Sequence, residues 1–102
     1  MKQFLIKYRR KNGSEAEWHQ NIAGFIAALE SDPGLRGISY RCMKVRGGDD
    51  YFHLAAATDD NALKALQSRD FFKRYTEATK HAGGGEVEVL PLDIVAETRP
   101  GL

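Results

Sequence analysis

The residues best suited to chemistry lie around a predicted hairpin in the middle of the chain. His53 stands inside the apolar run 51–57, and its neighbours Phe52 and Leu54 face away from it because successive strand side chains point to opposite faces. An imidazole with a pKa near ~6.5 takes up or releases a proton close to neutral pH. We therefore predict His53 as a catalytic base. The structural alternative is a hydrogen-bonded histidine at an interface between two subunits.

Tyr51 and Arg41 are predicted to share the face of His53. Tyr51 lies two residues from His53 on the same strand, and Arg41 follows from a hairpin register that pairs Val45 with Tyr51. This grouping gathers a phenol, a guanidinium and an imidazole around one cavity. Arg41 would stabilise a developing phenolate or enolate while His53 removes the proton. The alternative for Arg41 is an ion pair with a glutamate of the segment 86–90.

Two further residues complete the candidate substrate-binding set with Tyr51. Met43 shares the predicted face of Arg41, and Trp18 lies early in the first predicted helix, where packing between helix and sheet is its structural alternative. Cys42 is the one cysteine, and the histidines at positions 19, 53 and 81 lack metal-ligand spacing. We expect no intramolecular disulfide, no metal site and no cofactor.

Composition limits the classes of function. The 102 residues are 42% hydrophobic and 28% charged, which is typical of one soluble globular domain spanning residues 1–102. Fifteen Lys and Arg against fourteen Asp and Glu leave a net charge of +1, so we expect neither a nucleic-acid partner nor a membrane surface. The N-terminus lacks a signal-peptide pattern, and no window is apolar enough for a membrane span, so we predict a cytoplasmic protein.

The first third of the chain predicts a strand followed by a helix. Residues 3–9 alternate with a period of two, and residues 11–13 form a turn signal. Ser14 followed by Glu17 is a capping box that starts a helix. Its apolar stripe ends at the Asp-Pro-Gly sequence 32–34, and it consists of Trp18, Ile22, Phe25, Ile26 and Leu29.

The rest of the chain predicts a hairpin, a second helical stretch and a last strand. Residues 38–45 and 51–57 flank a glycine-containing loop at 46–50. Thr58, Asp59 or Asp60 caps the helical stretch that fades near His81, with a kink or a fresh turn capped by Ser68. The three glycines at 83–85 end that stretch, residues 86–90 form a strand, and residues 92–98 can extend along another sheet edge. Residues 100–102 form a frayed tail.

The order strand, helix, strand, strand, helix, strand is the ferredoxin-like α+β order, βαββαβ, with two helices on one face of an antiparallel sheet. We assign the more uniformly apolar set to the helix-covered face: Phe4, Ile6, Tyr8, Ile38, Tyr40, Cys42, Phe52, Leu54 and Ala56. The opposite face then carries Ser39, Arg41, Met43, Val45, Tyr51, His53, Ala55 and Ala57. A half-apolar sheet face of this kind predicts contact with a second subunit around a cavity.

The sequence resembles a known family at this point. The βαββαβ order, Trp18 early in the first helix, and Leu63, Leu66, Ser68, Phe71, Phe72 and Tyr75 in the second helical stretch are similar to antibiotic-biosynthesis-monooxygenase-like proteins of the dimeric α+β barrel type. The resemblance implies a homodimer and a cofactor-independent monooxygenase acting on a small aromatic or quinol-type substrate, or an isomerase that stops at proton transfer. The alternative is a non-catalytic small-ligand-binding or accessory homodimer.

Overall fold

The chain follows the predicted βαββαβ order with a divided second helical stretch. A computed structural model describes residues 1–99. The elements are β1 (Lys2–Arg9), α1 (Glu15–Ser31), the 3-10 helix η1 (Pro33–Leu35), β2 (Ile38–Lys44), β3 (Asp50–Ala57), α2 (Asp60–Ser68), α3 (Asp70–Ala82) and β4 (Val87–Leu92).

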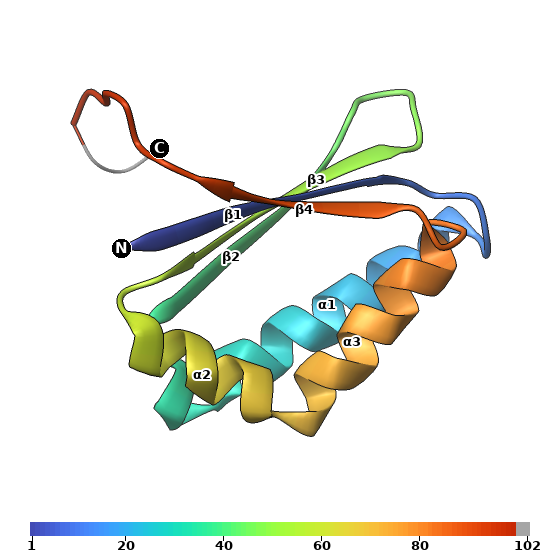
Figure 1. Cartoon of the computed structure of the whole chain (residues 1–102). Helices are drawn as coiled ribbons and strands as arrows, with labels where there is room; N and C mark the ends of the chain where they lie inside the picture. The colour runs from blue at the N-terminus through green and yellow to red at the C-terminus, as the bar shows by residue number, and fades with distance from the viewer. Residues whose placement is uncertain (100–102) are drawn as a thin grey trace.

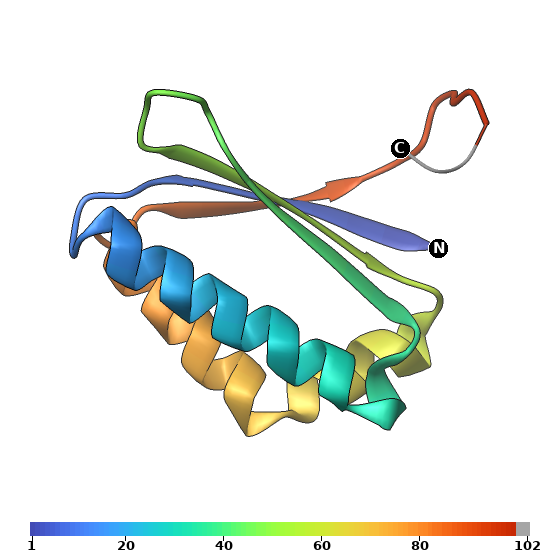
Figure 2. The ribbon, with the colours of Figure 1, turned by 180° about the vertical axis from the view of Figure 1, so that it is seen from behind.

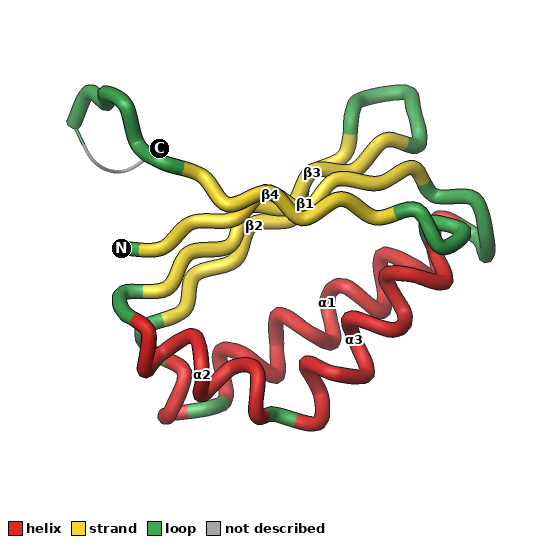
Figure 3. The backbone as a smooth tube through the Cα atoms, in the orientation of Figure 1, coloured by secondary structure: helices red, strands yellow, loops and turns green. Residues whose placement is uncertain are grey.

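The strands form one antiparallel sheet, and the helices cover one of its faces. The strand order is β2-β3-β1-β4, with β1 paired to both β3 and β4. All three α-helices lie below the sheet in Figure 1, and α1 runs beside α3 in the reverse view of Figure 2. The backbone trace separates a strand layer from a helix layer (Figure 3). This is the predicted ferredoxin-like α+β fold, with the other sheet face left uncovered.

Most helix ends lie where the capping residues of the sequence predict them. The Ser14 side chain accepts a hydrogen bond from the Glu17 amide at 3.2 Å, and Asp59 is the residue that caps α2. The second helical stretch breaks at Arg69, so the predicted fresh turn exists. However, Ser68 does not cap it, because its hydroxyl donates to the Ala65 carbonyl of the preceding helix.

The C-terminal part differs from the prediction in two respects. β4 continues past Pro91 to Leu92, which an edge strand tolerates because one side of its ladder needs no amide donor. Residues 93–99 form neither helix nor strand, so the further edge strand predicted at 92–98 is wrong beyond Leu92. The predicted tail at 100–102 lies outside the described residues.

The register of the β2–β3 hairpin corrects the predicted face of β3. Lys44, not Val45, pairs with Tyr51, and Cys42 pairs with His53. A shift of one residue moves every side chain of a strand to the other face. Tyr51 and His53 therefore lie on the helix-covered face, together with Ala55 and Ala57. The predicted core residues Phe52, Leu54 and Ala56 lie on the open face instead.

The loop between β2 and β3 is one residue shorter than predicted, which accounts for the different register. The Val45 amide donates to the Asp50 carbonyl at 2.9 Å, so the strands stay joined one residue further than predicted and only residues 46–49 turn. Gly47 supplies a φ of +78°, and the Lys44 ammonium donates to the carbonyls of Val45 and Gly48 at 3.0 Å each. Composition alone could not decide, because both faces of β3 are largely apolar.

The core lies between the sheet and the helices and is rich in aromatic rings. Its largest members are Tyr8, Trp18, Phe25, Tyr51 and Tyr75, packed with Leu29, Leu35 and Leu66.

Among residues 1–99, no helix is long and apolar enough to cross a membrane. Within the same residues, no three His, Cys, Asp or Glu side chains are grouped so as to hold a metal ion.

Candidate functional site

His53 is enclosed between the sheet and the helices. It is 0% exposed, and it projects from β3 into the aromatic core. Its ring meets Tyr8 edge-on at 5.1 Å and Tyr40 edge-on at 6.0 Å, and it lies nearly parallel to Tyr75 at 6.5 Å between centroids. A titratable imidazole is thus surrounded by phenol rings rather than by water.

Both ring nitrogens of His53 meet a phenol. The Tyr8 hydroxyl lies 2.9 Å from Nε2, and the Tyr75 hydroxyl lies 3.4 Å from Nδ1. The Trp18 indole N–H donates to the Tyr8 oxygen at 2.8 Å, and the Cys42 sulfur lies 3.9 Å from the Tyr75 hydroxyl. These five residues come from β1, α1, β2, β3 and α3, so the whole fold positions the cluster.

Burial keeps this cluster uncharged at neutral pH. Loss of hydration lowers the pKa of His53 to about 4, because the charged imidazolium is disfavoured away from water. The same effect raises the pKa values of Tyr8 and Tyr75 above their ordinary value, so both phenols keep their protons. It also raises the pKa of the Cys42 thiol to about 11. The site therefore offers neutral hydrogen-bonding groups: a neutral imidazole, two phenols and a thiol.

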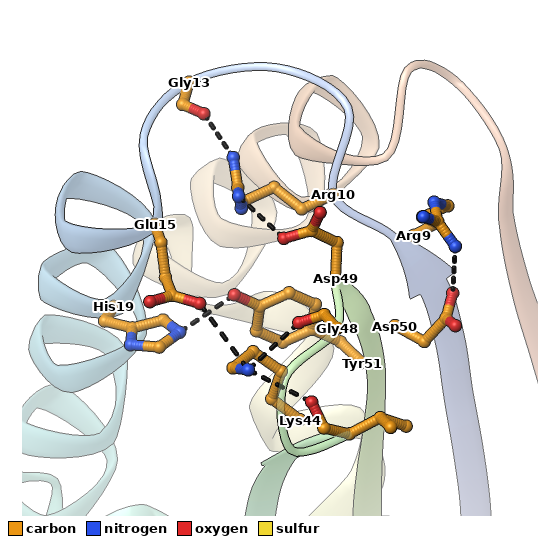
Figure 4. A network of polar contacts seen from close by, with 11 residues as sticks. Arg9, Arg10, Gly13, Glu15, His19, Lys44, Gly48, Asp49, Asp50 and Tyr51 are labelled. Carbon is orange, nitrogen blue, oxygen red and sulfur yellow. Dashed lines mark hydrogen bonds and ion pairs between the residues drawn. The ribbon is translucent and has the colours of Figure 1, made fainter.

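Tyr51 takes part in a second group of polar contacts, at the end of the sheet next to the β2–β3 loop. Its hydroxyl lies 2.8 Å from Nε2 of His19, while its ring stacks on Tyr8 at 5.2 Å. Figure 4 shows His19 and Glu15 of α1 reaching toward the hairpin, where Lys44 lies 3.6 Å from Glu15. These contacts fasten the start of α1 to the β2–β3 loop. No local sequence pattern predicts the contact of His19 with Tyr51, because it depends on the register that places Tyr51 on the helix-covered face.

Two more ion pairs join the strands and loops beside that group. Arg10 lies 2.8 Å from Asp49, and Arg9 lies 3.6 Å from Asp50 (Figure 4). Arg10 thereby connects the β1–α1 loop to the hairpin loop. We assign these contacts a structural role, which is to hold the loops and strands together, rather than a catalytic one.

The structure brings together three of the five predicted site residues. His53, Tyr51 and Trp18 share the interior, where each contacts Tyr8. Arg41 and Met43 lie on the open face, because Arg41 pairs with Leu54 and Met43 with Phe52. The predicted grouping of Arg41 around the cavity of His53 is therefore wrong within one chain, and the cause is the one-residue change of register. Tyr8, Tyr75 and Tyr40 are the neighbours that sequence analysis counted only as apolar packing.

Among the hollows of the described residues, two bear on this arrangement. One, of about 700 Å³, lies between the end of α1, η1 and β2, and Tyr40 lines it while also contacting His53. Its apolar wall consists of Ile26, Leu29, Leu35, Ile38 and Tyr40. A larger hollow of about 1260 Å³ lies over the open face, between Arg41 and the C-terminal residues 92–99.

Solved structures share this architecture over nearly the whole chain. SnoaB, a cofactor-independent oxygenase from Streptomyces nogalater, is 20% identical with a TM-score of 0.74, covering 98% of this chain and 97% of its own. A structure described as an antibiotic biosynthesis monooxygenase is 13% identical with a TM-score of 0.74, covering 94% and 100%. A dimeric ferredoxin-like protein of unknown function from Jannaschia sp. CCS1 is 20% identical with a TM-score of 0.64, covering 92% and 100%.

The likeness is one of structure rather than of sequence. The sequence matches no protein-family model and no curated protein. The resemblance expected from the order of elements is nevertheless confirmed at the level of the fold. The chain has the ferredoxin-like fold of antibiotic-biosynthesis-monooxygenase-like proteins.

Proposed function

We propose that the protein is a cofactor-independent monooxygenase that acts on a small aromatic or quinol-type substrate. The observation that carries the proposal is the neutral imidazole of His53, hydrogen-bonded in an aromatic interior, in a fold shared with a cofactor-independent oxygenase. An interior lined by rings suits an aromatic substrate. It also keeps water from a reactive carbanion.

The reaction draws its electrons from the substrate. An anthrone-type CH₂ group loses a proton to give an enolate, which reduces dioxygen. One oxygen atom then becomes the new carbonyl, and the other leaves as water with the two hydrogens of the carbon. The protein's part is to hold the enolate or phenolate oxygen and to exclude water.

The hollow beside Tyr40 is the proposed route of entry. Tyr40 lies in its wall and in ring contact with His53, so movement of this one ring connects the hollow with the imidazole. Arg41 lies on the other sheet face and has no part in this route within one chain. Neutral donors replace the cation that sequence analysis assigned to the site.

Oxygen uptake over a panel of anthrones and quinols tests the proposal. Purified protein is assayed with added chelator, and ¹⁸O₂ is used to trace one labelled atom into the product. We expect His53→Ala to lower turnover at least ten-fold, while Thr76→Val on α3 keeps the rate of the native chain. No uptake across the panel refutes the oxygenase. Substrate conversion without oxygen supports the isomerase instead.

One observation favours a second candidate, a non-catalytic binder of small ligands. Rings pack closely around His53, and Phe25 stacks on Tyr75 at 3.8 Å between centroids. An interior this closely filled leaves little room to turn over a substrate, which favours an accessory role or ligand binding outside the interior. Aromatic ligands that bind in calorimetry but are recovered unchanged, with and without oxygen, would select this candidate.

We also propose that two chains pair through the open sheet face. On this face Leu54 of β3, Leu5 of β1 and Leu90 of β4 lie side by side in one row across the sheet. Met43, Leu90 and Leu92 are 41%, 40% and 37% exposed, which is unusual for large apolar side chains on a sheet face. A second copy offers the same surface in a two-fold arrangement.

A further inference from the structure

The hydrogen bonds around His53 follow one order from donor to acceptor, from Trp18 to Tyr8 and from Tyr8 to His53. The Trp18 indole can only donate, so the Tyr8 oxygen accepts its hydrogen bond. The Tyr8 hydroxyl keeps its own proton and has Nε2 of His53 at 2.9 Å as acceptor. Nε2 therefore holds a lone pair, and a neutral imidazole then carries its hydrogen on Nδ1. This tautomer is an assignment from the donors and acceptors of the cluster.

The Nδ1 side of the imidazole is loosely held. The Tyr75 oxygen lies 3.4 Å from Nδ1, at the long end of a hydrogen bond. The Tyr75 hydroxyl also lies 3.9 Å from the Cys42 sulfur, and a thiol is a weak partner whichever of the two groups donates. Two buried donors, the His53 Nδ1–H and the Tyr75 O–H, thus lie together with weak partners.

We propose that His53 Nδ1–H and the Tyr75 hydroxyl form a site for one oxygen atom of the ligand, a phenolate or enolate oxygen. This inference rests on the proposed function and changes the role of His53 from base to hydrogen-bond donor. A ligand oxygen that lies to one side of this pair, within hydrogen-bond reach of both groups, accepts a strong bond from each, because bonds to an anionic acceptor are about twice as strong as neutral ones. Fixed donors in a dry site stabilise such an anion.

The surroundings of the two donors fit a ligand that carries a ring. Phe25 and Tyr40 meet edge-on at 5.0 Å, and both are in ring contact with Tyr75. Tyr40 also lines the hollow of about 700 Å³. Neither His53 nor Tyr75 lines this hollow, so the Tyr40 ring must turn aside before a phenol that enters from there reaches the Nδ1 side of His53. On the other side of the imidazole, Tyr8 already occupies Nε2, which leaves that nitrogen unsuited to remove a substrate proton.

The tautomer is tested without any ligand. Nitrogen-15 NMR of the labelled native chain should show a His53 signal typical of an N–H on Nδ1 and an unprotonated Nε2. In Tyr8→Phe, where the donor to Nε2 is gone, we expect the other tautomer to gain population. A native His53 with its hydrogen on Nε2 overturns the proposal.

Ligand ionisation tests the site itself, with 4-nitrophenol as the probe because its phenolate is yellow. We expect the bound probe to ionise at a lower pH than the free probe. Tyr75→Phe keeps the ring that stacks on Phe25 but removes the hydroxyl, and should weaken phenolate binding about ten-fold, or about 1.4 kcal/mol. His53→Asn keeps an N–H near Nδ1 and should bind more tightly than His53→Ala.

The matched control is Thr76→Val, which removes a hydroxyl next to Tyr75 that donates to the Phe72 carbonyl of the same helix. It should bind the probe as the native chain does. Failure of the native chain to bind the probe, or binding without a change in its ionisation, overturns the site. If the native chain fails this test but takes up oxygen, the site is refuted and the proposed monooxygenase is not. If it passes this test but takes up no oxygen, the monooxygenase is refuted and the site is not.

Discussion

The Tyr8 hydroxyl lies 2.9 Å from Nε2 of His53, with both residues buried on neighbouring strands. Trp18 donates to the same hydroxyl from α1, so one phenol oxygen links the sheet to the helix layer. A buried polar group is costly unless it is hydrogen-bonded. Tyr8 therefore satisfies two buried groups at once, and both the stability and the chemistry of this cluster depend on it.

Acid should destabilise the protein through His53. Its pKa is 6.5 in the unfolded chain and about 4 in the folded one, so between these values the unfolded chain binds a proton that the folded chain does not. The free energy of unfolding then falls as the pH is lowered, by about 1.4 kcal/mol per pH unit. Urea unfolding between pH 6.5 and 4.5 measures this slope.

His53→Gln is the comparison for that measurement, since it removes the titrating group and keeps a polar side chain. We expect its unfolding free energy to change less steeply over the same interval. The lowered pKa values of Asp32 and Glu86 add their own acid dependence near the lower end of this interval, but equally in both chains, so the difference between the two slopes reports His53. Equal slopes in both chains would contradict a buried, neutral His53.

Tyr8→Phe should destabilise the fold by about 1–3 kcal/mol, because it leaves the Trp18 N–H and His53 Nε2 without their shared partner. The ring itself stays in place against Tyr51. Thr76→Val is the control, since its hydroxyl bonds to a carbonyl of its own helix and its loss should cost less than 1 kcal/mol or so. Chemical denaturation of the three chains compares them. A loss no larger in Tyr8→Phe than in Thr76→Val would contradict the shared bond.

Much of the fold was predictable because its signals are local. Ser14 caps α1 as expected, and Asp59 was among the three residues expected to cap α2. The alternation of residues 3–9 placed Phe4, Ile6 and Tyr8 correctly on the helix-covered face. Such signals depend on the residue itself and on neighbours within one helical turn.

The site was less predictable because it depends on pairing between strands. The β2–β3 register differs by one residue from the prediction, and that difference separates Arg41 from His53. Apolar residues on both faces of β3 leave its orientation undecided in the sequence. The contact of Tyr8 with His53 joins positions 45 residues apart, so no local pattern contains it.

Two glycines should respond in opposite ways to replacement by alanine. At Gly83 a Cβ would lie 3.1 Å from the Glu86 carbonyl oxygen and 3.3 Å from Cβ of Tyr8, so Gly83→Ala forces backbone or core to move and should destabilise by about 1–3 kcal/mol. At Gly24, inside α1, a Cβ meets nothing within 4 Å, and Gly24→Ala should stabilise by about 0.5–1 kcal/mol. Thermal unfolding followed by circular dichroism gives both signs. Stabilisation by Gly83→Ala would contradict the close approach of Gly83 to β1 and β4.

Pairing of two chains through the open face makes Met43 sensitive to charge. Met43 is 41% exposed in one chain and lies beside Phe52, so a partner would bury it. Met43→Glu should split the dimer, since an unpaired carboxylate buried at an interface costs several kcal/mol. Val89→Glu is the control, because Val89 is 58% exposed and pairs with Ile6 on the other face. Analytical ultracentrifugation at micromolar concentration should find Val89→Glu at twice 11.4 kDa and Met43→Glu at 11.4 kDa. A native chain that sediments as a monomer would refute the pairing.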